Sequence, residues 1–160
     1  MIRPVKISDA PDIMEIYNHY VEESAWTQEY DPIDLEEQEN RIRKIIATYP
    51  YLVHEEDGKV IGYAYATQFR WKIGYRFTVE TTIYIHKDHL NKKIGRRLYA
   101  DVLALCQEQG FHRAIAGLTL PNDRSAYFHE KLGFTKVGVF SECAQKFGVW
   151  HDIGFWELEL

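Results

Sequence analysis

The 160-residue sequence has no run of about 18 uninterrupted apolar residues, the length that a helix needs to cross a bilayer. It also lacks the apolar core of a signal peptide, because Arg3 and Lys6 interrupt its first segment. Cysteine is scarce: Cys106 and Cys143 are the only two, and neither belongs to a CxxC pair. These absences predict a cytoplasmic protein with no membrane partner, no disulfide framework and no zinc site.

A basic excess is missing as well, since 19 Lys and Arg residues stand against 24 Asp and Glu residues and the formal net charge is -5. This balance disfavours nucleic acid as a partner, because nonspecific binding to phosphates needs a positive field. Hydrophobic residues make up 46% of the chain and aromatic residues 14%, which is enough to form a core. The chain has no linker-like tract, and residues 1–160 are predicted to form a single domain.

Hydrophobic spacing predicts an alternation of strands and helices. The predicted helices are residues 8–21, 34–49, 94–110 and 121–133. The predicted strands are residues 2–7, 51–55, 60–66, 79–86, 112–120, 134–143 and 150–160. The strand–helix–strand order over residues 79–120 predicts a right-handed βαβ unit with two parallel strands. The fold class is therefore α/β, with a mixed sheet.

A basic turn, His89–Arg97, joins the strand at residues 79–86 to the following helix. Exposed N–H groups and the positive end of the helix favour a phosphate there. Gly95 permits close approach of the backbone, and basic side chains add charge at Lys92, Lys93, Arg96 and Arg97. By itself this pattern is also typical of a solvated helix start.

Taken with the segment Asn122–Phe134, this turn resembles the GNAT superfamily of N-acetyltransferases, and the resemblance covers essentially the whole chain. It implies a mixed, mostly antiparallel sheet with a central parallel βαβ unit and flanking helices. It also implies acetyl-CoA as cosubstrate, with the pantetheine arm along one strand and the pyrophosphate at the basic turn. The implied cofactor-binding residues are Ile83, Tyr84, Ile85, Asn91, Lys92, Lys93, Ile94, Gly95, Arg96 and Asn122.

Four further segments resemble the phosphinothricin and methionine sulfoximine acetyltransferases: Ile16–Tyr20, Tyr75–Glu80, Ile83–Ile85 and Gly148–Trp156. This likeness implies a homodimer that acetylates the amine of a small amino acid or analogue. The aromatic density of the last segment is typical of an interface.

Glu80 is the implied general base, and its alternative interpretation is a surface carboxylate on an edge strand. His129 stands where many GNAT enzymes have the Tyr that protonates the CoA thiolate. It is expected to be that acid, a pantetheine contact or a structural residue. The implied substrate-binding residues are Gly74, Tyr75, Arg76 and Phe77, of which Arg76 suits a carboxylate.

The basic turn departs from the GNAT pattern at Leu90 and at Lys93, where the family has Gln or Arg and Gly. A non-Gly residue is uncommon at positive φ. Lys93 therefore predicts either a different loop path or a weaker affinity for CoA, which its charge offsets in part.

Two alternatives stay open. The acceptor could be a polyamine, an aminoglycoside or a protein N-terminus, or the chain could be a noncatalytic acyl-CoA binding module. The seven histidines are scattered without ligand spacing, so no metal is expected.

Overall fold

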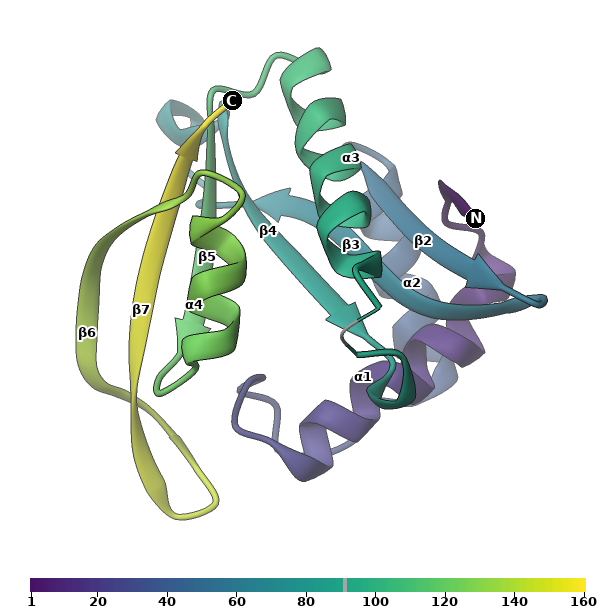
Figure 1. The fold of residues 1–160 in the computed structure, drawn as a ribbon, viewed down its shortest axis with the longest axis horizontal. Coiled ribbons are helices and arrows are strands. Elements are labelled where there is room, and N and C mark those ends of the chain that lie inside the picture. The colour runs from purple at the N-terminus through teal and green to yellow at the C-terminus, as the bar shows by residue number, and fades with distance from the viewer. Residues whose placement is uncertain (91) are drawn as a thin grey trace.

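The computed structural model describes residues 1–90 and 92–160 and shows a seven-stranded sheet with helices on both faces (Figure 1). The strands are β1 (Ile2–Pro4), β2 (Tyr51–Glu56), β3 (Lys59–Gln68), β4 (Thr78–Ile85), β5 (Arg113–Thr119), β6 (Thr135–Lys146) and β7 (Val149–Glu159). The helices are α1 (Ala10–Glu23), α2 (Leu35–Ile46), α3 (Ile94–Glu108) and α4 (Asp123–Glu130).

The strand order is β1-β2-β3-β4-β5-β7-β6, and every pair is antiparallel except β4–β5. The parallel pair is joined through α3, as the βαβ prediction requires. This arrangement confirms the predicted fold class, a mixed and mostly antiparallel sheet with a central parallel unit.

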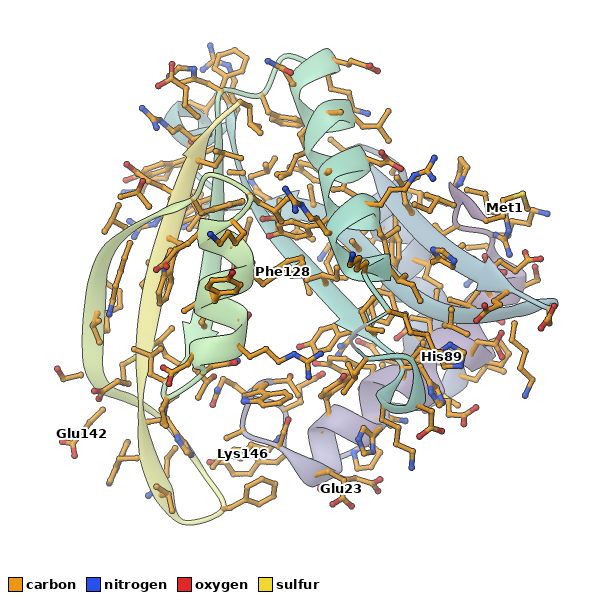
Figure 2. All side chains as sticks on the ribbon, in the orientation of Figure 1. Met1, Glu23, His89, Phe128, Glu142 and Lys146 are labelled. Carbon is orange, nitrogen blue, oxygen red and sulfur yellow. The ribbon has the colours of Figure 1, made fainter. Side chains whose placement is uncertain are left out.

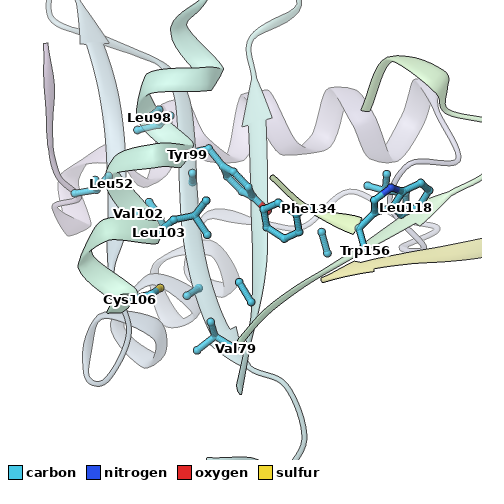
Figure 3. Packing of buried hydrophobic residues seen from close by; sticks show 14 residues of the cluster. Leu52, Val79, Leu98, Tyr99, Val102, Leu103, Cys106, Leu118, Phe134 and Trp156 are labelled. Atoms are coloured by element: carbon cyan, nitrogen blue, oxygen red, sulfur yellow. The ribbon is translucent and has the colours of Figure 1, made fainter. Parts of the chain in front are cut away.

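Two apolar cores lie on opposite faces of the sheet. On one face α1 and α2 cover β2 and β3, where Ile13, Ile42 and Tyr63 are buried. On the other face α3 and α4 cover the middle of the sheet, and Tyr99 and Trp156 belong to this second core (Figure 3). In the view of Figure 1, α3 and α4 lie in front of the sheet and α1 and α2 behind it.

Local signals explain several boundaries. The Asp34 side chain caps α2 by accepting a hydrogen bond from Glu37 N at 2.8 Å. Asp57 and Gly58 both have positive φ, as the two-residue turn between β2 and β3 requires. Among the helices of residues 1–90 and 92–160, none is long and apolar enough to cross a membrane.

The end of the predicted strand 134–143 is wrong by three residues, because β6 continues to Lys146. Lys146 pairs with Val149 in β7, and Phe147 and Gly148 form the connecting turn with φ of 53° and 72°. Phe-Gly lacks the Asn or Asp that normally signals such a turn. Lys146 is buried, although lysine is almost never fully buried in folded proteins.

Candidate active site

The site is built where β4 and β5, the parallel pair, separate. They pair only over Thr78–Glu80 and Arg113–Ile115, and beyond these residues the two strands diverge (Figure 1). β3 pairs with β4 as far as Ile85, and β7 pairs with β5 as far as Thr119. Within the part of the chain that the structure describes, the facing edges of β4 and β5 therefore lack a strand partner after they diverge.

Main-chain groups of alternate β4 residues face this opening. The hydrogen bonds between β3 and β4 use the even-numbered residues of β4, so Ile83 and Ile85 turn their N–H and C=O groups away from β3. The Ile85 carbonyl accepts a hydrogen bond from the Tyr20 hydroxyl at 2.6 Å. Tyr84 differs from the other two residues expected along pantetheine, because its main chain bonds to β3 and its ring packs against Tyr20.

Glu80 is the last residue of β4 that pairs with β5, so it lies at the apex of the opening between these two strands. Its strand is the fourth of seven, so the alternative position on an edge strand is wrong. Gly117 of β5 lies beside the carboxyl group, since a Cβ built there would be in van der Waals contact with Glu80 Oε1, at 3.9 Å. Among the described residues the Glu80 carboxylate has no hydrogen-bond or ion-pair partner, and burial raises its pKa. A half-buried carboxyl without a counter-charge is suited to accept a proton.

The basic turn brings the start of α3 against the open end of β4. Lys93 is left-handed, with φ of 61° and ψ of 5°, a backbone conformation that favours glycine. A Cβ built on Gly95 would meet Ile83 at 3.4 Å, Phe128 at 3.6 Å and Ile85 at 3.7 Å. Figure 2 shows Phe128 on α4. The first turn of α3 therefore packs against the side chains of Ile83 and Ile85 in β4.

Of the other residues expected at the pyrophosphate, Lys92 and Arg96 are exposed and Ile94 is half-buried. Lys92 Nζ lies 3.3 Å from Nδ1 of His89, which comes from the turn before it. Asn91 was also expected there and lies outside the described residues.

The side chain of Asn122 opens α4, where its Oδ1 accepts a hydrogen bond from Ser125 N at 3.1 Å. This acceptor is thus used by the helix cap, and the amide N–H groups stay available. The position fits the expected contact with a cofactor between α3 and α4.

His129 is 3% exposed and both of its ring nitrogens have partners inside the protein. Nδ1 lies 2.7 Å from the Ser125 carbonyl oxygen, and Nε2 lies 3.2 Å from the Tyr99 hydroxyl. Burial lowers the pKa of the imidazole, and the bond to the Ser125 carbonyl opposes that shift. Tyr127, two residues earlier, is 62% exposed on the opposite side of α4. The sequence did not single out Tyr99, because a Tyr at a core position of an amphipathic helix has no distinguishing signal.

The loop before β4 carries the residues expected to hold the substrate. Gly74 and Tyr75 lie in a short 3₁₀ turn, and Arg76 donates to the Ile73 carbonyl at 3.2 Å. The Arg76 guanidinium lies 4.4 Å from the centre of the Phe77 ring. A cavity of about 410 Å³ is lined by Gln68, Phe69, Arg70, Trp71, Lys72 and Tyr75. Of the expected substrate-binding residues, Tyr75 lines this cavity and Phe77 does not.

A second cavity of about 540 Å³ lies between α2 and the sheet. It begins beside the catalytic candidate, because Thr67, one of its lining residues, pairs with Glu80. Its aromatic walls are Tyr17, Tyr49, Tyr51, Tyr63 and Tyr65, with Gln38, Arg41 and Lys44 among the polar residues. This cavity was not predicted from the sequence, although the spacing of Tyr63 and Tyr65 along a strand places both side chains on one face.

The described residues include no group of three His, Cys, Asp or Glu side chains placed to hold a metal ion. Both cysteines are free, Cys106 in the core and Cys143 on the surface.

Known proteins resemble this chain over nearly its full length. Residues 2–154 match the family model described as "Acetyltransferase (GNAT) domain". A curated relative, the phosphinothricin N-acetyltransferase of Streptomyces viridochromogenes, is 36% identical over 156 residues, which are 98% of this chain and 85% of the relative.

Two solved structures are similar over the full chain. One is a GNAT superfamily phosphinothricin acetyltransferase from Sinorhizobium meliloti in complex with AcCoA, with a TM-score of 0.96, 34% identity and coverage of 100% of this chain and 88% of that one. The other is a ribosomal-protein-alanine N-acetyltransferase from Brucella melitensis, with a TM-score of 0.98, 32% identity and coverage of 100% and 99%.

Proposed function

The chain belongs to the GNAT acetyltransferase family and is an acetyl-CoA-dependent N-acetyltransferase, and from this we propose that its acceptor is the amine of a small amino acid or amino-acid analogue. Phosphinothricin and methionine sulfoximine or sulfone represent the substrate type. The observation that carries the proposal is the unpaired carboxylate of Glu80 at the apex of the opening between β4 and β5.

Glu80 acts as the general base. An amino-acid amine is mostly protonated at pH 7 and must lose a proton before it attacks the thioester. Burial raises the pKa of Glu80, which makes the carboxylate a stronger base than an ordinary glutamate. Alignment of amine and thioester supplies the rest of the rate enhancement, up to about 7–11 kcal/mol in ideal cases.

The open edge of β4 holds the pantetheine arm of acetyl-CoA as an added strand would be held. Ile83 and Ile85 supply the main-chain groups for this contact, and an N–H on that edge stabilises the oxyanion of the tetrahedral intermediate. Lys92, Lys93, Ile94, Gly95 and Arg96 bind the pyrophosphate through main-chain N–H groups and positive charge. Asn122 contacts the cofactor from the start of α4.

The acceptor lies on the α1–α2 side of the sheet. Arg76 binds its carboxylate, since among the described residues one guanidinium nitrogen, Nη1, donates to the Ile73 carbonyl and the other N–H groups are available. The tyrosine-lined cavity beside Thr67 takes the side chain of the acceptor. The phenols there remain neutral, because burial raises the pKa of Tyr63 and Tyr65.

His129 has a structural role in this proposal. Direct protonation of the thiolate would require the ring to leave both Ser125 and Tyr99, its partners in the core.

The protein works as a cytoplasmic homodimer of single-domain subunits. Support for the interface comes from exposed apolar side chains on the β6–β7 hairpin: Val137, Val139, Phe140, Phe147, Val149 and Trp150. An edge strand of 12 residues such as β6 is also a ready site for pairing with a second copy.

A protein N-terminus is the second candidate acceptor, favoured by the likeness to the ribosomal-protein-alanine N-acetyltransferase structure. The noncatalytic alternative is less favoured, because Lys93, where the family has Gly, adopts the left-handed backbone conformation.

Thiol release from acetyl-CoA, measured across a panel of acceptors, tests the proposal. We expect activity with phosphinothricin or methionine sulfoximine and little with spermidine, an aminoglycoside or an Ala-initiated peptide. Replacement of Glu80 by Gln should lower kcat about 10²–10⁴-fold and leave CoA binding intact. The wild type should lose activity as pH falls toward the raised pKa of Glu80, because the carboxylate becomes protonated, and the variant should lack this Glu80-dependent loss. Activity on peptides alone would overturn the acceptor class, and unchanged turnover in the Glu80→Gln variant would overturn the base.

A further inference from the structure

The Tyr99 hydroxyl lies at the centre of a buried hydrogen-bond chain that links β4, α3 and α4. Tyr99 is 0% exposed, and its oxygen lies 2.6 Å from Thr81 Oγ1 and 3.2 Å from His129 Nε2. Thr81 Oγ1 also lies 3.3 Å from the carbonyl oxygen of Ile115 in β5. The chain therefore runs from the β4–β5 boundary through α3 to α4.

The acceptors fix the direction of this chain. A carbonyl oxygen can only accept, so His129 Nδ1 carries the hydrogen that bonds Ser125, and in the neutral ring Nε2 is an acceptor. Tyr99 then donates to Nε2, and the single Thr81 hydroxyl hydrogen is shared between the Tyr99 oxygen at 2.6 Å and the Ile115 carbonyl oxygen at 3.3 Å. Each hydroxyl and ring nitrogen is satisfied when all three side chains are neutral.

The position of the chain gives it a mechanical role. Thr81 is the first residue of β4 beyond the segment that pairs with β5. α3 packs on β2, β3 and β4, whereas α4 packs on β5 and β6. The two halves of the sheet share only three paired residues on each strand, and the bond between Tyr99 and His129 joins the helices that cover those halves. In Figure 3 Tyr99 extends from α3 toward Phe134, the residue that precedes β6.

We propose that Tyr99 is a positioning residue that, through Thr81 and His129, fixes the separation of β4 and β5 and thereby the fit of the pantetheine arm. The inference rests on the cofactor placement described under the proposed function and is independent of the acceptor. The hydroxyl makes no contact with substrate and transfers no proton in the reaction. Its loss leaves Nε2 of His129 without a donor and lets the two halves of the sheet move apart.

The test variant is Tyr99→Phe, which keeps the ring in the core and removes only the hydroxyl. Calorimetry with CoA should show about five- to twentyfold weaker binding, which corresponds to one buried hydrogen bond. KM for acetyl-CoA should rise in parallel, and kcat should stay within about twofold. The matched control is Tyr127→Phe, which removes a phenol oxygen from the exposed side of α4 and should bind CoA as the wild type does.

Thr81 supplies a second pair of variants that does not depend on the stability of Tyr99→Phe. Thr81→Val should reproduce the weaker CoA binding, and Thr81→Ser, which keeps the hydroxyl, should restore it. The double variant Tyr99→Phe with Thr81→Val should bind no more weakly than either single variant, because both break the same chain.

Three results would overturn the inference. One is unchanged CoA affinity in Tyr99→Phe and Thr81→Val, and another is a lower melting temperature with unchanged affinity. A third is a fall in kcat with unchanged affinity and a shifted pH profile, which would assign proton transfer to this chain. A failure to acetylate amino acids would refute the proposed acceptor and leave the CoA titrations valid.

Discussion

Lys146 should be among the most costly side chains to remove, although the proposed reaction does not use it. Lys146 is 1% exposed. Its ammonium donates to the carbonyls of Val21 at 2.6 Å, Ser24 at 2.8 Å and Thr27 at 3.0 Å. These carbonyls end α1 and begin the loop that leads to α2 (Figure 2). One charged side chain from the tip of the β6–β7 hairpin thus satisfies three main-chain acceptors more than 100 residues away.

We expect Lys146→Met to destabilise the protein by about 3–5 kcal/mol. Each hydrogen bond to a charged donor contributes about 1.5–3 kcal/mol. Desolvation of the ammonium offsets part of that sum, and it also lowers the pKa of Lys146. Methionine fills most of the space, so the net loss comes from the three carbonyls that become unsatisfied. That loss is a large share of an ordinary stability of about 5–15 kcal/mol.

Urea unfolding monitored by tryptophan fluorescence and circular dichroism measures this loss. At about 2–4 °C per kcal/mol, the melting temperature should fall by about 6–20 °C. Lys59→Met, at an exposed position in β3, is the control and should change stability by less than about 0.5 kcal/mol. A loss below about 1 kcal/mol for Lys146→Met would refute the reasoning, because it would mean that water replaces the ammonium at all three carbonyls.

The remaining predictions concern the basic turn and the subunit interface. Lys93→Gly should raise the melting temperature by about 2–8 °C, because a side chain at φ of 61° costs about 1–2 kcal/mol. It should also weaken CoA binding about two- to fivefold, since one cation beside the pyrophosphate is lost; tighter binding in calorimetry would contradict that expectation. Phe140→Glu, on the exposed face of β6, should convert the proposed dimer to a monomer in light scattering, and a dimer that persists would place the interface elsewhere.

The sequence predicted the βαβ unit and the order of strands and helices along the chain, because both depend on the local spacing of apolar residues. Lys93 predicted either a different loop path or a weaker affinity for CoA, and in the structure its backbone adopts the left-handed conformation. A sequence pattern reports what residues prefer, whereas the packing of α3 on β4 and α4 decides what the turn must adopt.

The central position of Glu80 could not be read from its own strand, because alternation along β4 is the same at the edge of a sheet as in its middle. Only the pairing of β4 with both β3 and β5 makes the carboxylate half-buried and raises its pKa. The tyrosine-lined cavity likewise depends on how α2 crosses the sheet, which no local signal specifies.

Tyr99 and His129 show why a motif position does not determine a role. In the motif, His129 stands where the family commonly has a tyrosine, and this substitution favoured an acid. In the fold, the shorter imidazole ends inside the core and meets a phenol from α3 that already bonds Thr81. Because the ring is buried, its charged form is disfavoured, and the same burial that lowers its pKa makes it a dependable acceptor for Tyr99. We therefore propose that the histidine stays neutral and joins α3 and α4 through its hydrogen bond with Tyr99.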